Sequence, residues 1–507
     1  MFTPIKEKKE YKIALIQPIV KIGKTLRIQK SPAGIQYIGA QLKKAGYKVK
    51  LFHEIINRAV IKTVLEFNPD QIGISTMTAN FLAGKELASQ IKKQNKKVII
   101  TLGGWHATGS ANSYLNNYED ITIKEILYKK SPFDFIVVGE GELVYSELIE
   151  KLRNNKPISD IVGLGYIEQN KIILSRANRI LDLDSLEDPI WDGLDINKYR
   201  DLRSGELDLS LHIQRGCRFN CAYCSTPNMY QGKQTRLSAK RAAKQIKYLV
   251  DNFSPNVITF TDEDFFGNLP WIDGLCNEII KLKLNKKIKF DTFGSINDII
   301  RASESGLLKK MKTAGFNSYF VGIESLNKKT LLNYNRPIKK ERPIKEYLKT
   351  IQKAIDLSND AGLIFLPDYM VGAFWESEKE VISGFNKLKK LKNIPYVYLP
   401  ILTPMPGTKL WNFVFEKDLI ITKNEKIDWN KYNASSQTVK LGYDVVNLRN
   451  KLEIEFYTSK QYLTEMNTKI KTEKNQKSYY LGLFNKLSKD HSKSAKIKNT
   501  LQKIKNM

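Results

Sequence analysis

Three of the four cysteines of this 507-residue chain lie within eight residues, in the segment GCRFNCAYC. They are Cys217, Cys221 and Cys224, spaced as C-x3-C-x2-C. Thiolates bind zinc or iron–sulfur clusters, and a structural zinc site needs four ligands, usually as two separated pairs. A single triad instead suits a four-iron cluster that leaves one iron open to a substrate or cofactor. We therefore predict a [4Fe–4S] cluster on these cysteines, whereas Cys276, in an apolar helical pattern, is expected to be a small buried side chain.

A second set of candidate residues is acidic and follows apolar stretches that read as strands. Asp262, Glu263 and Asp264 lie in TDEDFF, and Glu324 lies in GIES. Acidic residues at the carboxyl ends of barrel strands are more often functional than stabilising. The alternative for the first three is that they are solvated acids that cap the next helix.

A third set combines hydroxyl groups with glycines, again after apolar stretches. Ser75 and Thr76 follow QIGI, Gly103 and Gly104 follow VIITL, and His106 comes two residues later. Hydroxyl groups can hydrogen-bond a polar ligand, and glycines let the backbone approach it closely. We expect His106 either to line such a pocket or to be a solvated loop residue.

The N-terminal part of the chain has the alternation that would position the third set. Helical patterns, for example at 34–48 and 83–93, separate most of five short apolar stretches. These stretches are 11–18, 49–54, 70–76, 96–104 and 133–142. Strands that alternate with helices predict a doubly wound α/β domain over 10–155, with ligands at the carboxyl ends of its strands.

The remainder of the chain divides into three parts. Residues 156–205 are irregular and acidic, which predicts a linker, and contain a β-hairpin at 163–174. Residues 206–415 return to the strand–helix alternation with six candidate strands, which predicts a partial (β/α)6 barrel. Residues 416–507 are basic, polar and mostly helical in pattern.

The cysteine loop after the first strand of a partial barrel resembles the radical S-adenosylmethionine (SAM) superfamily. In that family SAM chelates the open iron, and one electron from the cluster cleaves SAM to a 5′-deoxyadenosyl radical. The resemblance implies that Tyr223, just before the last cysteine, packs near the adenine. It also implies that Asp262, Glu263, Asp264 and Glu324 contact SAM.

The N-terminal domain resembles the cobalamin-binding domain that precedes the barrel in one class of this superfamily. That class includes the anaerobic magnesium-protoporphyrin monoester cyclase and hopanoid-modifying enzymes. The class carries S-x-L and G-G motifs, which the segments at 75–77 and 103–104 resemble, and LTPMPGTKLW (402–411) resembles its TPxPGT turn. The resemblance implies that six residues serve cobalamin: Gly34, Ser75, Thr76, Gly103, Gly104 and His106.

The sequence departs from this class at the D-x-H-x-x-G motif. Gly34 is in place, but Gln29 stands for the aspartate and Ser31 for the histidine. No histidine of that motif is therefore present to bind cobalt. Many cobalamin-dependent members of the superfamily lack it as well.

The charge balance is strongly positive, at +29 from 82 Lys plus Arg and 53 Asp plus Glu. Most of the basic residues are lysine, whereas nucleic-acid readers favour arginine, so we expect a solvated surface and no nucleic acid. We find no run of 18 apolar residues and no secretory segment at the N-terminus, which predicts a cytoplasmic protein. A short amphipathic pattern at 478–489 would suit peripheral membrane contact or packing on the barrel.

These observations predict a cobalamin-dependent radical SAM enzyme that works without oxygen. Hydrogen abstraction from an unactivated carbon would be followed by methyl transfer from methylcobalamin, or by a corrin-assisted rearrangement or cyclisation. The first alternative is a radical SAM enzyme with a degenerate cobalamin domain, and the second is a basic RNA-binding protein with a structural metal site. We expect a small-molecule or lipid-like substrate and a reductant of the flavodoxin or ferredoxin type.

Overall fold

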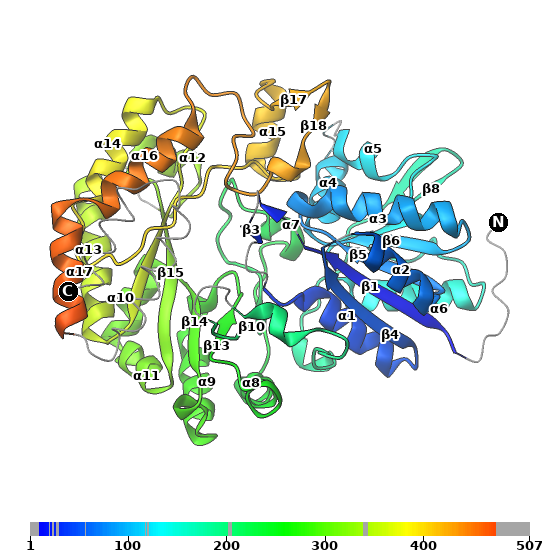
Figure 1. Ribbon diagram of the computed structural model, residues 1–507, viewed down its shortest axis with the longest axis horizontal. Coiled ribbons are helices and arrows are strands. Elements are labelled where there is room, and N and C mark those ends of the chain that lie inside the picture. The colour runs from blue at the N-terminus through cyan, green and yellow to red at the C-terminus, as the bar shows by residue number, and fades with distance from the viewer. Residues whose placement is uncertain are drawn as a thin grey trace. The chain divides into compact units, whose positions relative to one another are not determined.

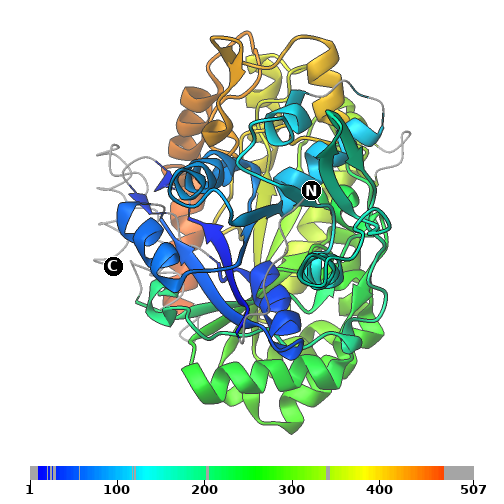
Figure 2. The same ribbon diagram turned by 90° about the vertical axis from the view of Figure 1, so that its right-hand side faces the viewer.

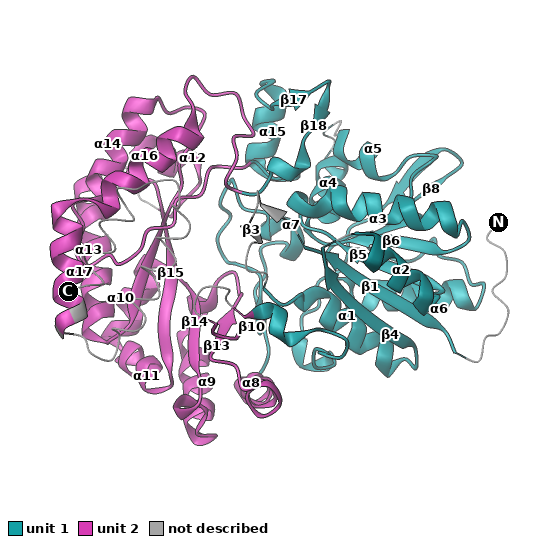
Figure 3. Cartoon of the chain, viewed as in Figure 1, with its two compact units in different colours: residues 1–199, 212–238, 404–433 teal, residues 200–211, 239–403, 434–507 magenta. Residues whose placement is uncertain are grey.

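The computed structural model describes residues 10–472, except 20, 23–24, 27–29, 56, 117, 119–120, 201–204 and 338–342. Gln29 and the amphipathic pattern at 478–489 lie outside the described residues. The chain forms two compact units, coloured separately in Figure 3. Unit 1 contains residues 1–199, 212–238 and 404–433, and unit 2 contains 200–211, 239–403 and 434–507.

Unit 1 is built on a seven-stranded sheet in the order β4-β1-β5-β6-β7-β8-β9. Its five parallel strands follow the predicted apolar stretches, whose central residues are buried as a strand covered on both faces requires. They are β1 Lys12–Pro18, β4 Lys48–Glu54, β5 Gln71–Ser75, β6 Ile99–Gly103 and β7 Phe135–Val137. The strand order reverses beside β1, which makes this a doubly wound sheet with a switch point between β1 and β5.

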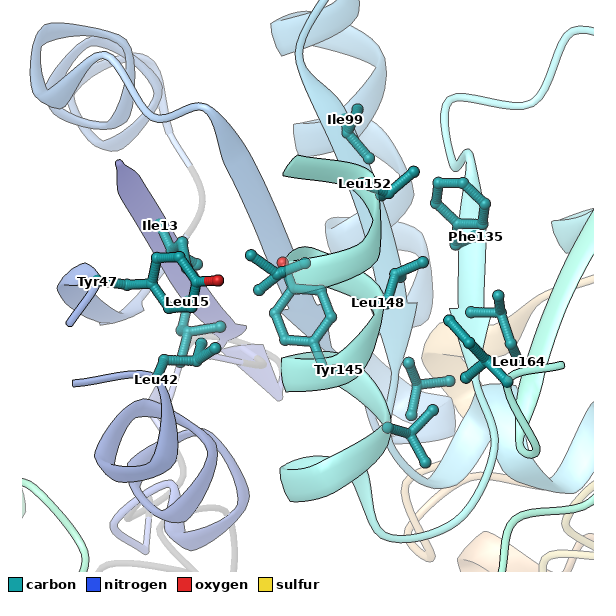
Figure 4. Close-up of a cluster of buried hydrophobic side chains, with 14 of the residues drawn as sticks. Ile13, Leu15, Leu42, Tyr47, Ile99, Phe135, Tyr145, Leu148, Leu152 and Leu164 are labelled. Atoms are coloured by element: carbon teal, nitrogen blue, oxygen red, sulfur yellow. The ribbon is translucent and has the colours of Figure 1, made fainter. Parts of the chain in front are cut away.

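Helices connect these strands, and Figure 2 looks onto unit 1 and shows them on either side of the twisted sheet. The helices are α1 Ala33–Lys44, α2 Arg58–Phe67, α3 Phe81–Gln94, α4 Trp105–Leu115, α5 Ile121–Ile126 and α6 Gly141–Arg153. In Figure 4, Tyr145 and Leu148 of α6 lie between Leu15 and Leu42 on one side and Phe135 on the other. This cluster fixes α1 and α6 on one face of the sheet by apolar burial.

The predicted hairpin forms, but it belongs to the first sheet rather than standing alone in a linker. Its strands are β8 Leu164–Glu168 and β9 Lys171–Leu174. Gln169 and Asn170 between them both have positive φ, 48° and 63°, as the tightest hairpin turns require. Because β8 pairs antiparallel with β7, the hairpin extends the edge of the doubly wound sheet.

Unit 2 contains a parallel sheet in the order β10-β13-β14-β15-β16, with helices between its strands (Figure 1). The strands are β10 Asp208–Leu211, β13 Val257–Phe260, β14 Lys289–Gly294, β15 Phe316–Glu324 and β16 Ile364–Tyr369. The sixth expected strand is present only as two isolated parallel bridges, from Asp368 to Tyr398 and from Val371 to Ile401. Prolines at 395, 400 and 404 limit this segment because they donate no ladder hydrogen bond.

The barrel helices bury one face each against this sheet. They are α8 Ala239–Phe253, α9 Leu269–Lys281, α10 Ile296–Glu304, α11 Leu307–Thr313, α12 Lys328–Asn333, α13 Ile344–Asp360 and α14 Glu378–Leu388. Phe260, Phe290 and Phe316 of three strands are buried together, with ring centroids 5.4–6.0 Å apart. Parallel strands, covering helices and this aromatic layer make a partial barrel whose strand ends share one rim.

The remaining elements divide between the two units. Unit 1 takes the short pieces α7 Thr226–Tyr230, α15 Lys409–Glu416, β17 Thr422–Lys423, β18 Lys426–Ile427 and η6 Trp429–Lys431. Unit 2 ends with α16 Val445–Tyr457 and α17 Lys460–Thr472. In the part of the chain that the structure describes, no helix is long and apolar enough to cross a membrane.

Candidate active site

The cysteine loop is framed by a short antiparallel pair, β11 Gln214–Arg215 and β12 Thr235–Arg236. Gly216 starts the loop with φ of +86°, and a Cβ there would lie 2.1 Å from the carbonyl oxygen of Lys233. Only glycine therefore lets the two ends of the loop approach this closely. The loop belongs to unit 1, although the strand before it, β10, belongs to unit 2.

The sulfur atoms of Cys217 and Cys224 accept hydrogen bonds from nearby backbone N–H groups. Cys221 is buried, and Cys217 and Cys224 are half-buried. The backbone N–H of Phe219 donates to Cys217 Sγ (3.4 Å), and that of Thr226 donates to Cys224 Sγ (3.5 Å). Such donors stabilise thiolates and tune the potential of a cluster that they hold.

The donor set fits a four-iron cluster. Among the described residues, no three His, Cys, Asp or Glu side chains converge as the ligands of a single metal ion do. A cubane does not need that convergence, because each thiolate binds a different iron. Cys276 lies apart in α9, where burial raises the pKa of its thiol to about 12, so it stays protonated and inert.

The TPMPGT segment holds the cysteine loop against α4 within unit 1. A Cβ on Gly109 would lie 2.4 Å from the carbonyl oxygen of Pro406, and Gly407 has φ of +79°. The backbone N–H of Leu410 donates to the carbonyl of Ala222, between two of the cysteines (3.0 Å). The predicted structural turn is therefore present, and it supports the loop directly.

Five of the six predicted cobalamin residues come together at the carboxyl ends of β5 and β6. Ser75 pairs with Gly103 in the sheet, and the N–H of Thr76 donates to the carbonyl of Gly103 (3.0 Å). Gly104 has φ of +90°, and a Cβ on it would meet Thr76 O at 2.6 Å and Ser75 Oγ at 2.9 Å. The hydroxyl of Thr76 is buried and has no hydrogen-bond partner among the described residues. A glycine cradle beside an unsatisfied hydroxyl suits the polar tail of a cobalamin.

His106 is buried in α4, so the interpretation as a solvated loop residue is wrong. Its ring stacks on Phe81 at 4.1 Å between centroids and meets Trp429 edge-on at 4.9 Å. In the part of the chain that the structure describes, neither ring nitrogen has a hydrogen-bond partner. Burial, with a smaller contribution from Lys85, lowers the pKa of His106 to about 3, so the ring is neutral at physiological pH.

Gly34 stands apart from this group, at the exposed start of α1, and no atom of the described residues lies within 4 Å of where its Cβ would be. Ser31, at the position of the missing motif histidine, is buried just before that helix. No hydrogen bond found in the structure joins Gly34 to the β5–β6 group.

The acidic trio in unit 2 is not a solvated helix cap. Asp262 and Asp264 are buried, and Glu263 is half-buried. The N-terminus of the next helix, α9, is capped instead by Asn268, whose side chain accepts from the N–H of Trp271 (2.9 Å). Buried carboxylates at the end of a barrel strand suit the cationic amino group of a ligand.

Glu324 lies at the end of β15 in a backbone conformation that is unusual outside glycine, with φ of +65°. The pairing of β15 with β16 shifts register at this point. A Cβ on Gly322 would lie 2.2 Å from Glu324 Oε1, and Arg336 Nη1 lies 3.7 Å from the same oxygen. Strain of this kind persists where surrounding contacts impose it, often at functional sites.

Sequence reasoning missed Asp368, an acid inside the apolar run LIFLPDYMVG. It pairs with Gly322 across β15 and β16, and one of its carboxylate oxygens is buried with no hydrogen-bond partner among the residues that the structure describes. Burial, reinforced by the charge of Glu324, raises its pKa well above the ordinary value. The signal was the single acid in an otherwise apolar strand.

The predicted residues thus form three groups. The cysteines and Tyr223, which is half-buried, lie on one loop of unit 1, and the β5–β6 group also lies in unit 1. The acidic trio and Glu324 lie at strand ends of unit 2.

Two family models match the chain. The radical SAM superfamily matches residues 211–382, and the B12 binding domain matches residues 21–149. The first covers the cysteine loop, the acidic trio and Glu324. The second covers Gly34 and the β5–β6 group.

Known proteins resemble the chain over most of its length. An uncharacterized methyltransferase of Pyrococcus horikoshii is 26% identical, covering 89% of this chain and 93% of that protein. The anaerobic magnesium-protoporphyrin IX monomethyl ester cyclase of Cereibacter sphaeroides is 24% identical, covering 81% of this chain and 63% of the cyclase. The solved structure of OxsB, a cobalamin-dependent SAM radical enzyme, has a TM-score of 0.67 at 16% identity, covering 94% of this chain and 72% of OxsB. That likeness concerns the fold.

Proposed function

We propose that this chain, a radical SAM enzyme with a B12-binding domain, transfers a methyl group to a carbon atom of a small-molecule or lipid-like substrate. The observation that carries methyl transfer is the extent of the likeness to a methyltransferase, which spans 93% of that relative. The cyclase has more than a third of its length outside the matched region. Rearrangement or cyclisation is the second candidate reaction, favoured by that same partial likeness.

The cofactors are a [4Fe–4S] cluster, SAM and cobalamin. When bound, they supply an electron, a carbon-centred radical and a methyl group. In our proposal Cys217, Cys221 and Cys224 each bind one iron, and the fourth iron is left to SAM. The backbone N–H groups of Phe219 and Thr226, which donate to Cys217 Sγ and Cys224 Sγ, would stabilise these two sulfurs as ligands.

In our proposal the residues of unit 2 bind SAM. Asp262 and Asp264 are buried carboxylates, and Glu324 is fixed by its backbone and by Gly322. They would accept hydrogen bonds from the amino group and ribose of SAM, with Glu263 at their edge. Tyr223 would pack its ring on the adenine from the cysteine loop.

The residues of the β5–β6 group would bind the nucleotide tail of cobalamin. Thr76 has a buried hydroxyl to donate, Ser75 lies beside it, and Gly103 and Gly104 carry no side chain that would hinder the approach of the tail. His106 is neutral and buried between Phe81 and Trp429, so we assign it to the wall of this region rather than to cobalt. Gly34, at the start of α1, would let the backbone there pass close to the corrin.

The test pairs two cysteine variants of the full chain, expressed with cobalamin and purified without oxygen. Cys221→Ala should lose most of its iron and all reductive cleavage of SAM to 5′-deoxyadenosine. Cys276→Ala makes the same chemical change in α9 and should keep wild-type iron, cobalt and cleavage. Circular dichroism checks that both variants fold.

The outcomes separate the parts of the proposal. Unchanged 5′-deoxyadenosine from Cys221→Ala would refute the cluster assignment. Near-stoichiometric cobalt in the wild type, with S-adenosylhomocysteine formed during turnover, is the expected result for methyl transfer. Turnover without S-adenosylhomocysteine would overturn methyl transfer in favour of rearrangement or cyclisation.

A further inference from the structure

A buried arginine comes two residues before the first cysteine. The side chain of Arg215 is 5% exposed, and its guanidinium donates to Glu140 Oε1 (2.8 Å) and Glu142 Oε1 (2.7 Å). Its guanidinium carbon also lies 5.0 Å from the centroid of the Tyr37 ring. One side chain of the cysteine loop is thereby fastened to three residues of the doubly wound domain.

A second arginine fastens the other end of the loop to the same acid. Arg179 pairs with Glu140 and donates to Thr235 Oγ1 (3.2 Å), and its guanidinium lies over the Tyr230 ring at 4.8 Å. Thr235 is the residue opposite Arg215 in the β11–β12 pair. Both strands that frame the loop therefore meet at Glu140.

The two arginines and two glutamates of this network sum to zero net charge, and nearby backbone groups stabilise the two carboxylates. The side chains of Arg215, Arg179, Glu140 and Glu142 are all 3–5% exposed. Glu140 and Glu142 lie at the N-terminus of α6, where the helix dipole stabilises negative charge. The N–H of Ile180 also donates to Glu140 Oε2 (2.9 Å). Removing one member would leave a buried charge without its partner, which proteins tolerate poorly.

Replacing a buried ionic network by apolar side chains of similar volume is often neutral for stability, so the property that distinguishes this network is its directionality. The guanidinium of Arg215 is planar and holds its two donor nitrogens in a rigid fork, so hydrogen bonds to two different carboxylates fix its direction. Across two peptide units the Cα atoms of Arg215 and Cys217 are at most about 7.6 Å apart. A side chain fixed in direction at this distance also fixes the start of the cysteine loop.

We propose that Arg215, Arg179, Glu140 and Glu142 form an ionic lock that holds the cysteine loop in its cluster-binding conformation before any iron arrives. These are positioning residues, since they act through the cysteines. The inference rests on the cysteines being the cluster ligands, which belongs to the proposed function. The lock itself needs no metal, so it can be tested on the apoprotein.

The experiment measures hydrogen exchange of the metal-free full chain, comparing peptides over 214–236 with peptides over 144–152 in the α6 core. Arg215→Met and Glu142→Gln should speed exchange of the loop at least tenfold and leave the core unchanged. Arg215→Lys should give a smaller increase, because an ammonium group cannot bond both carboxylates in one plane. Glu147→Gln is the matched control, since Glu147 lies on α6 but pairs with Lys151 at the surface.

A second measurement follows iron uptake during anaerobic reconstitution. The two lock variants should take up iron several-fold more slowly than wild type, and Arg215→Lys should recover part of the rate. Unchanged loop exchange in Arg215→Met would overturn the lock, as would equal acceleration in the α6 core, which marks general destabilisation. Cys221→Ala should lose iron yet keep wild-type loop exchange, so a failed cluster assignment and a failed lock give different results.

Discussion

Replacing Gly109 by alanine tests whether the TPMPGT segment supports the cysteine loop. Gly109 lies inside α4, and its Cβ would be 2.4 Å from the carbonyl oxygen of Pro406. Ordinary contacts of a Cβ begin near 3.4 Å, so the turn must retreat by about 3.4 − 2.4 = 1.0 Å. Backbone carbonyls cannot rotate away as a flexible side chain does.

The expected cost follows from three terms. Overpacking of this kind costs about 1–3 kcal/mol. Stretching the Leu410 to Ala222 hydrogen bond, which is 3.0 Å long, removes about 1 kcal/mol more. Alanine in a helix interior recovers about 1 kcal/mol relative to glycine. The net local destabilisation is about 1–3 kcal/mol, which corresponds to a roughly 5- to 150-fold change in an opening equilibrium.

The assay is hydrogen exchange over residues 404–412 together with iron content after reconstitution. Exchange should accelerate within that range, and iron should fall, because Ala222 lies between two cysteines. Gly274→Ala is the matched control, since Gly274 lies inside α9 and its Cβ would meet only Ala239 at an ordinary 3.6 Å. In Gly274→Ala the free energy of unfolding should rise by about 0.5–1 kcal/mol. Unchanged exchange and iron in Gly109→Ala would refute the support of the loop by this turn.

Two further predictions concern Glu324 and His106. Gly322→Ala should displace the Glu324 carboxylate, because the new Cβ would lie 2.2 Å from Oε1. Calorimetry on the reconstituted enzyme should then show SAM binding weakened at least tenfold. Wild-type affinity would contradict the SAM-binding role of Glu324. Burial lowers the pKa of His106 to about 3 in the folded protein, whereas the ordinary value of 6.5 applies to the unfolded chain. As the pH falls below 6.5, the unfolded chain therefore takes up the proton first. The contribution of this residue to the free energy of unfolding is complete above pH 6.5 and is lost as the pH falls towards 3. Between pH 6.5 and 4.5 this amounts to about 2–3 kcal/mol; His106→Phe should remove that part of the loss in denaturant titrations, and an unchanged pH dependence would show that the ring is solvated.

Much of the fold was predictable because strands covered on both faces are short apolar runs. The five parallel strands of unit 1 follow this rule. The polar pair Gln169-Asn170 correctly predicted the hairpin turn. The sheet edge that the hairpin joins was not predictable, because the alternation in β9 identifies two faces but no neighbour. The sixth barrel strand was overestimated, because its prolines break the ladder that its apolar residues suggest.

The site was predictable where chemistry is encoded in spacing and was missed where it depends on distant contacts. The C-x3-C-x2-C spacing of the three cysteines is specific to few kinds of metal site, so it predicts the cluster directly from the sequence. The burial of His106 is set by Phe81 and Trp429, which are 25 residues before it and 323 after it in the numbering. The positive φ of Glu324 has no local signal other than Gly322 two residues earlier.

The assignment of 212–238 and 404–433 to unit 1 has a consequence for how the protein is made. On the ribosome the cysteine loop emerges first, and another 165 residues, 239–403, must follow before the turn that contacts Ala222 exists. Domains at the start of a chain usually fold during synthesis, but this one cannot be completed until translation has passed residue 410. Iron delivery to the nascent chain would therefore meet a loop that still lacks one of its supports, and a truncated product ending within the barrel would carry all three cysteines without a finished site.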